Sequence, residues 1–235
     1  RNYKVDQSFV NQMINASALD NGLHAGDLKF VDLDGNNKIE QTTSANDRKD
    51  MKVIGNSLPR YNYNLGISAD WYGIDFSVLF QGIGKQNWYP GAETSMFWGP
   101  YSRPYASFIP SDFMSQVWSE ENSNAYFPRP RGYVALGSNR ELAVVNTKYL
   151  QNLAYCRLKN LSIGYTLPDK WLSKIGFEKI RVYFSGENLL TFTKLHSDYI
   201  DPEQASASNS WKTSKSDANI YPWAKTYSFG VDITF

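Results

Sequence analysis

The chain has 235 residues, and its 24 basic and 23 acidic side chains leave a net charge of +1. This length fits one all-β domain, and the balanced charge offers neither the basic patch of a nucleic-acid-binding protein nor a polybasic membrane anchor. No run approaches the roughly 18 apolar residues of a membrane helix, and the single cysteine, Cys156, excludes an internal disulfide.

Aromatic residues are abundant and crowd near the ends of the expected strands. The chain has 16 Tyr, 13 Phe and 7 Trp, together 15% of its residues. Such crowding is typical of the interfacial girdles of an outer-membrane barrel. Because the chain begins at Arg1, without an initiator Met or a signal peptide, we expect it to be a mature or cleaved piece of a longer protein.

The first clear pattern is a hairpin over residues 60–85. Alternate residues from Tyr61 to Trp71 are apolar or aromatic, and the same alternation resumes from Ile74 to Phe80 after the pair Tyr72–Gly73. A period of two indicates half-buried strands, and a two-residue link containing Gly indicates a tight turn.

A second hairpin is expected over residues 147–194. In its first strand the apolar residues change parity between Leu158 and Leu161, which predicts a β-bulge near Lys159 and Asn160. Pro168 ends this strand, and the segment PDKWLSKIG predicts a short helical turn before a strand that starts near Ile180.

The chain ends in KTYSFGVDITF, which reads as a last strand over 224–235. Tyr227, Phe229, Val231, Ile233 and Phe235 fall on one face of it, and polar or small residues fall on the other. A soluble sandwich would bury this apolar face, whereas an outer-membrane barrel would place it against lipid.

The links between strands alternate between short and long, at about 2, 60, 12 and 30 residues, which is typical of barrels with short periplasmic turns and long extracellular loops. Five strands do not close, because the smallest barrels need about eight. We therefore expect a transmembrane antiparallel β-barrel whose other strands lie upstream. Its parts are an extracellular region 1–59, a hairpin 60–85, a long extracellular loop 86–146, a hairpin with a periplasmic helical turn 147–194, an extracellular loop 195–223 and a carboxyl-terminal strand 224–235.

Several blocks resemble a known family. They are AGDLKFVDLDGNNKIE at 25–40, the following DRKDMKVIGNSLPRYNYNLGIS, VWSEENSNAYFPR at 117–129, CRLKNLSIGYTLP at 156–168, IRVYFSGENLLTFTK at 180–194, DPE at 201–203 and the strand ending in Phe235. In order and content they resemble the carboxyl-terminal part of SusC/RagA-type TonB-dependent outer-membrane transporters.

This resemblance implies the fold, the partners and the location of the chain. The family has a barrel of about 22 strands with an amino-terminal plug, and such plugged barrels occur among outer-membrane transporters. This chain would supply the last five or so strands and contact outer-membrane lipid. The resemblance further implies energy from TonB through an amino-terminal part without counterpart here, a SusD-like surface lipoprotein as lid, and import of oligosaccharides or oligopeptides. The terminal aromatic resembles the signal read by the outer-membrane assembly machinery.

The segment from Asp32 resembles the start of an EF-hand-like calcium loop. Asp32, Asp34 and Asn36 would supply oxygen ligands and Lys38 a backbone carbonyl, with Asp47 completing the set if extra residues loop out. Asn37 replaces the expected Gly, and Thr43 stands where a carboxylate is needed. Bound Ca²⁺ in the loop at 32–47 is one interpretation, and an Asx-rich turn held by local hydrogen bonds is the other. No other cofactor is expected.

Aromatic residues in the long loop are candidates for contact with a ligand or with the lid. Aromatic rings stack on the apolar faces of sugars, while neighbouring polar groups bind hydroxyls. The alternative is that the rings pack the loop against itself and its neighbours. The candidates are Trp88, Tyr89, Phe97, Trp98, Tyr101 and Tyr105.

Other polar groups carry less specific signals. His196, Ser197 and Asp198 are adjacent, but a catalytic triad needs groups from separate segments, so we do not expect an enzyme. We interpret four acids of the last loop as solvated, namely Asp198, Asp201, Glu203 and Asp217. We expect four residues on the inward side of the 180–194 strand to contact a plug, namely Arg181, Tyr183, Ser185 and Glu187. The rival to the transporter is a soluble or surface β-sandwich that binds carbohydrate.

Overall fold

The computed structural model describes most of the chain. The described residues are 24–36, 39–42, 44–102, 108–137, 141–173, 176–208, 215–216 and 221–235, with backbone only for 206–208 and 215–216. They fall into two compact units. The sheet unit takes its residues from Asn56–Trp88, Gln151–Ser214 and Ile220–Phe235, and the loop unit from Arg1–Gly55, Tyr89–Leu150 and Lys215–Asn219.

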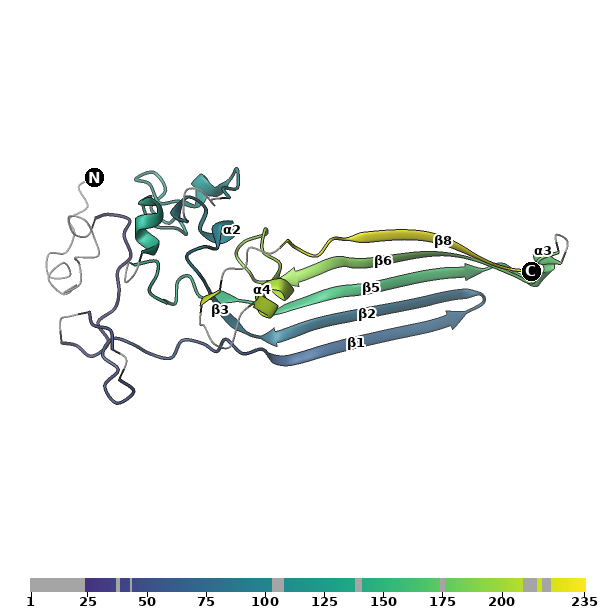
Figure 1. Cartoon of the computed structure of the whole chain (residues 1–235), viewed down its shortest axis with the longest axis horizontal. Coiled ribbons are helices and arrows are strands. Elements are labelled where there is room, and N and C mark those ends of the chain that lie inside the picture. The colour runs from purple at the N-terminus through teal and green to yellow at the C-terminus, as the bar shows by residue number, and fades with distance from the viewer. Residues whose placement is uncertain are drawn as a thin grey trace. The chain divides into compact units, whose positions relative to one another are not determined.

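The sheet unit is dominated by one five-stranded antiparallel sheet, in which long strands lie side by side (Figure 1). The spatial order is β1-β2-β5-β6-β8, and every neighbouring pair is antiparallel. The strands are β1 (Arg60–Trp71), β2 (Ile74–Lys85), β5 (Tyr155–Thr166), β6 (Lys179–Thr193) and β8 (Thr226–Thr234). These are the five strands that the alternation predicts.

The hairpin turn and the bulge are also confirmed. Tyr72 and Gly73 both have positive φ, 47° and 83°, which is the geometry of a two-residue turn that matches the twist of the strands it joins. Residue Lys159 has no partner in the pairing of β5 with either neighbouring strand, because the register shifts at this residue in both pairings. One extra residue moves the side chains that follow to the opposite face, which is why the apolar parity changes there.

The two ends of the sheet are built differently. The β1–β2 turn, the short helix α3 (Asp169–Leu172) and the carboxyl terminus lie at one end, and α4 (Pro202–Ser208) lies at the other (Figure 1). At the first end the rings of Phe177 and Phe235 are in contact, with centroids 5.2 Å apart.

The remaining elements are short. They comprise β3 (Asn87–Pro90), β4 (Gln151–Asn152), β7 (Lys215–Ser216), α2 (Ser95–Trp98) and 3₁₀ turns at Gly99–Tyr101, Phe113–Gln116 and Gly132–Leu136. The strands β4, β3 and β7 form a small sheet in that order. Among the described residues, no helix has the length and apolarity needed to span a membrane.

Candidate functional site

The two faces of the five-stranded sheet differ sharply in chemistry. Pairing in register places the apolar side chains of neighbouring strands opposite one another, as with Ile67, Val78 and Leu161. One face therefore carries a continuous apolar band, which we call the apolar face. The opposite, polar face carries mostly small, hydroxylated and charged side chains such as Ser77, Ser162 and Ser185.

Most of the apolar face is exposed. On β8, the exposed fractions of Tyr227, Phe229, Val231 and Ile233 are 61%, 83%, 58% and 48%. Val78, in the middle of the sheet, is covered by its neighbours and is only 7% exposed. An exposed apolar band of this extent is far larger than the scattered hydrophobic residues of an ordinary soluble surface.

The polar face carries an ion-pair cluster near the β1–β2 turn. Arg181 on β6 donates through Nε and Nη2 to the two carboxylate oxygens of Asp75 on β2, at 2.7 and 2.6 Å, and through Nη1 to Asp232 on β8 at 3.2 Å. The guanidinium reaches β2 by crossing β5 at Gly164. A Cβ at Gly164 would come within 2.6 Å of Arg181 Nε, so the crossing requires glycine.

A second cluster lies on the same face toward the other end of the sheet. Arg157, whose side chain is only 2% exposed, donates to Asp201 and Glu203 at 2.6 Å each, and Lys159 pairs with Glu203 at 2.9 Å. Arg157 also donates to Thr191 Oγ1 at 2.9 Å. Because charge-assisted bonds in a buried setting are strong, this cluster fixes the segment after β6 to the sheet.

Asp201 holds both ends of the segment between β6 and β8. One carboxylate oxygen accepts from the backbone N–H groups of Glu203 and Gln204, capping the start of α4, and the other accepts from the backbone N–H of Trp223. The ammonium of Lys159 lies 5.0 Å from the centre of the Trp223 ring. The interpretation of Asp201 and Glu203 as solvated acids is therefore wrong, since both pair with buried or half-buried cations. Asp217 lies outside the described residues.

The loop unit has an aromatic core of its own. Phe127 is its centre, with its ring 4.7 Å from Phe113, 5.7 Å from Phe97 and 5.9 Å from Tyr149 between centroids. Trp98 packs edge-on against Phe97 and Tyr149 at 4.8 and 5.3 Å. Edge-to-face and offset contacts of this kind are the favoured arrangements of aromatic rings.

The polar tips of these rings are satisfied by backbone carbonyls. Tyr89 donates to Leu142 at 2.7 Å, Tyr101 to Pro128 at 2.5 Å and Trp98 to Gly91 at 3.0 Å. Burial raises the pKa of the Tyr89 and Tyr101 hydroxyls, which keeps them protonated as donors.

The five described aromatic candidates are therefore buried. Trp88, in the sheet unit, is 1% exposed, as is Tyr89 in the loop unit, and Phe97, Trp98 and Tyr101 are 2% exposed or less. A ring that stacks on a ligand needs an open face, and these rings have none. Their burial favours packing, the alternative open at the sequence level, and contact with a ligand or lid stays a prediction. Tyr105 lies outside the described residues.

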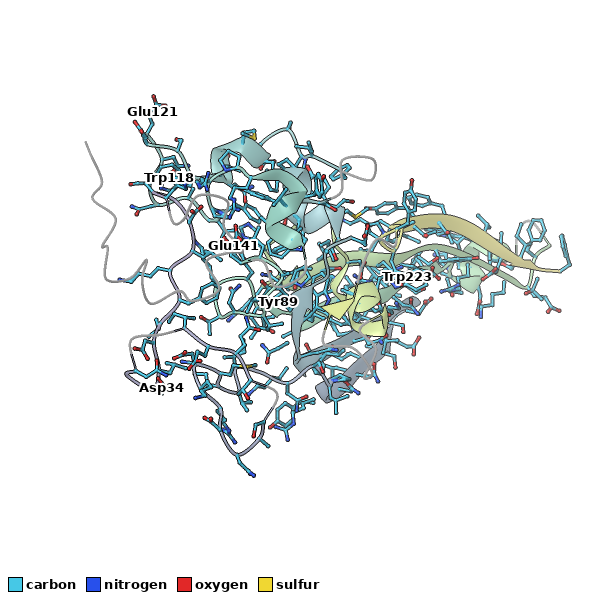
Figure 2. The ribbon with its side chains drawn as sticks, turned by 60° about the vertical axis from the view of Figure 1, so that its left-hand side comes forward. Asp34, Tyr89, Trp118, Glu121, Glu141 and Trp223 are labelled. Carbon is cyan, nitrogen blue, oxygen red and sulfur yellow. The ribbon has the colours of Figure 1, made fainter. Side chains whose placement is uncertain are left out.

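Two sequence blocks that are far apart in the chain meet in the loop unit. Asp27 of the first block pairs with Arg129 of the second at 2.5 Å, and the Asp27 side chain is 2% exposed. Gly26 lies against the Trp118 ring, where a Cβ would overlap with it, and its carbonyl accepts from the Arg129 N–H at 3.0 Å. Trp118 is labelled in Figure 2.

A buried acid, Glu141, lies in the same unit (Figure 2). Its side chain is 4% exposed, and Oε1 accepts from Arg131. Its other oxygen, Oε2, is buried and meets no hydrogen-bond partner in the part of the chain that the structure describes. Burial raises the pKa of the Glu141 carboxyl, and its pairing with Arg131 only partly offsets this rise.

The acidic turn near Asp34 is held by local hydrogen bonds. The carboxylate oxygens of Asp32, Asp34 and Asp50 lie within 4.8 Å of one another. Asp50 accepts from the Leu33 and Glu40 N–H groups at 2.7 Å each, and Asp32 accepts from the Gly35 N–H at 2.7 Å.

The ligand set expected from sequence is thus partly reordered. Asp47 does not join the group but pairs with Lys49 at 3.4 Å, and Asp50 takes the third place. The side-chain amide of Asn36, expected to supply a ligand oxygen, donates through Nδ2 to Asp34 and Glu40. Lys38 lies outside the described residues. Calcium binding at this turn stays a prediction.

Comparison with known proteins gives consistent relatives. The chain is 31% identical over 212 residues to TonB-dependent receptor P3 of Formosa agariphila, a match that covers 88% of this chain and 19% of the relative. It is 26% identical over 136 residues to TonB-dependent receptor SusC of Bacteroides thetaiotaomicron, covering 55% of this chain and 12% of that protein. The chain is a relative of the SusC/RagA-type TonB-dependent receptors. It spans about a fifth of the length of the first curated relatives it matches. No protein-family model matches it.

Solved structures agree on the fold of this receptor relative. A chain of the RagAB peptide importer in its 'closed-closed' state superposes with a TM-score of 0.55 at 23% identity, covering 87% of this chain and 20% of that one. In the 'open-open' state the TM-score is 0.53 at 21% identity. The chain therefore shares its antiparallel fold with a part of the RagAB chain.

Proposed function

We propose that the chain forms the carboxyl-terminal part of the barrel wall of a TonB-dependent importer in a bacterial outer membrane. Its strands would be the last five of a barrel of about 22 strands whose lumen holds a plug. The apolar face would contact lipid, and the polar face would line the lumen. The segments between β2 and β5 and between β6 and β8 would then be extracellular.

One observation carries this proposal, namely the exposed apolar face of the sheet. A lipid-facing strand alternates apolar and polar residues, and about 9–11 residues cross the bilayer when the strand is tilted. The five strands have 12, 12, 12, 15 and 9 residues and follow this alternation. A soluble sandwich would instead cover the apolar face with a second sheet, and the side chains of β8 remain 48–83% exposed on that face.

The transported class is a nutrient too large for simple diffusion, an oligosaccharide or an oligopeptide. The likeness to the RagAB peptide importer and to the receptor SusC is compatible with either class. A SusD-like lipoprotein would close the outer mouth, and TonB would act on the plug. Transport of this kind needs no covalent chemistry, and the relatives are named as receptors and importers rather than enzymes.

Mass spectrometry of the complex extracted from membranes in mild detergent tests this proposal. We expect the tryptic peptides of this chain to belong to a longer polypeptide that includes a plug, and to co-purify with a lipid-modified partner. A chain of this length recovered alone from the soluble fraction, with no detergent present, would contradict it.

A further inference from the structure

The edge strand β8 pairs with β6 on one side, and on its other side no strand of the described chain is paired with it. An unpaired strand edge in a membrane leaves backbone N–H and C=O groups without partners, which is strongly unfavourable. The question is whether a side chain of the sheet is arranged to receive the strand that must cover this edge.

An internal example shows how a tyrosine links alternate strands of this sheet. Tyr63 on β1 stands directly opposite Gly82 on β2, and the tip of its ring lies over that glycine, where a Cβ would overlap with its Cζ and hydroxyl. The hydroxyl then donates to the backbone carbonyl of Tyr155 on β5 at 2.8 Å. A tyrosine on one strand, with glycine on the next, thus reaches the backbone of the third.

Tyr183 repeats this arrangement at the edge. It stands directly opposite Gly230 on β8, and a Cβ at Gly230 would overlap with the same two atoms, the Cζ and hydroxyl of the tyrosine. Within the part of the chain that the structure describes, the Tyr183 hydroxyl meets no hydrogen-bond partner. The third strand, which would supply the carbonyl, is the one beyond β8.

The ring of Tyr183 also contacts Arg181. The Arg181 guanidinium lies 4.7 Å from the centre of the ring and is itself fixed by Asp75 and Asp232. A side chain that contacts a plug would rise from the sheet, whereas the Cζ and hydroxyl of this ring lie over Gly230 of β8.

We propose that Tyr183 donates a hydrogen bond across Gly230 to a backbone carbonyl of a further antiparallel strand that pairs with the open edge of β8. This bond fixes the register in which that strand joins. The inference rests on the proposed function, because a closed barrel is what supplies such a strand. It differs from the interpretation of Tyr183 as a contact for the plug.

Photo-crosslinking in the full-length receptor tests this directly. With p-azidophenylalanine at position 183 and illumination in outer membranes, we expect a crosslinked peptide that comes from a barrel strand outside residues 1–235. A crosslink to a plug peptide would overturn the proposal while leaving the barrel intact. A receptor that runs at one gel position with and without heating has no closed barrel, and that result would contradict the proposed function itself.

A conservative substitution gives a second, independent readout. Tyr183→Phe removes only the hydroxyl, so we expect the heat-modifiable barrel to unfold several degrees lower, as for Tyr63→Phe at the internal pair. Tyr227→Phe is the matched control, because this β8 residue is 61% exposed on the apolar face. Melting of Tyr183→Phe at the temperature of the wild type, with Tyr63→Phe lowered, would overturn the proposal.

Discussion

At the scale of single residues, glycines determine how long polar side chains lie on the sheet. Gly164 lets Arg181 cross one strand to Asp75, and Gly82 lets Tyr63 cross another to a backbone carbonyl. The sequence shows which face each residue occupies, because alternation has a strict period of two. It does not show which long side chain lies over which glycine, because this depends on the register between strands far apart in the chain.

Substitution of Gly164 tests this role of glycine. In Gly164→Ala the added methyl group would collide with Asp75 and Arg181, so their ion pair must open, and we expect the barrel to be less stable because its charge-assisted hydrogen bonds are lost. The measurement is urea unfolding of the full-length receptor in detergent. Gly66→Ala is the control, since the nearest atom to its added Cβ is a Leu79 methyl at 3.9 Å. Equal stability of the two variants would contradict the account.

Glu141 gives a pH dependence with a definite sign. Burial raises the pKa of its carboxyl above the ordinary value of 4.5, so the folded loop unit holds this proton at a pH where the unfolded chain has released it. The stabilising contribution is fully present below about pH 4.5 and is lost as the pH rises through the raised pKa. Hydrogen exchange of the 126–150 peptides, corrected for the intrinsic pH dependence of exchange, measures this loss.

The matched variants separate this effect from net charge. Glu141→Gln cannot titrate, so we expect its hydrogen exchange to lose the rise with pH that the loss of stability causes. Glu121→Gln removes an exposed acid of the same unit (Figure 2), so we expect that variant to keep the rise. A rise that survives in Glu141→Gln would assign the pH dependence to another group. Sequence reasoning missed Glu141 because nothing in the residues around it signals that the acid is buried.

At the scale of elements, the strands can be predicted from the sequence, but the ion pairs that hold the segment after β6 cannot. The parity change around Lys159 predicted the bulge, because one extra residue leaves a visible mark on a period of two. The ion pair of Arg157 with Asp201 was missed. An arginine within a strand, together with the two acids of the DPE segment, is a usable signal for such a pair once the strands are placed. Asp50 was missed for a similar reason, since it lies 16 or more residues from the acids it joins.

Removal of Arg157 should release the segment that follows β6. In Arg157→Met the buried Asp201 loses its charged partner, and breaking a buried pair in this way costs about 3–5 kcal/mol. We expect faster hydrogen exchange at the amides of Glu203, Gln204 and Trp223, which Asp201 holds. Arg60→Met, on the exposed edge strand β1, is the control. Unchanged exchange at these three amides would show that the ion pair does not anchor the segment.

At the scale of the whole molecule, the fold can be predicted from regular sequence patterns. The exposure of the aromatic residues that are candidates for ligand contact cannot be predicted in this way. Five alternating stretches and unequal links between them indicate the sheet. The aromatic rings of 88–101 were indistinguishable in sequence from a binding surface, because exposure depends on partners such as Phe113, Phe127 and Tyr149 that come from other segments. Irregular segments have no period from which burial can be read.

The most direct test of the central claim is the environment of the two faces of β8 in the membrane. Spin labels placed one at a time at residues 227–233 of the full-length receptor, with Cys156 replaced by Ala, would be probed by oxygen, which partitions into lipid, and by a water-soluble nickel complex. We predict maximal oxygen and minimal nickel accessibility at Tyr227, Phe229, Val231 and Ile233, with lower oxygen accessibility at the residues between them. Low accessibility to both probes at those four positions would show a face buried in protein and would contradict the membrane barrel.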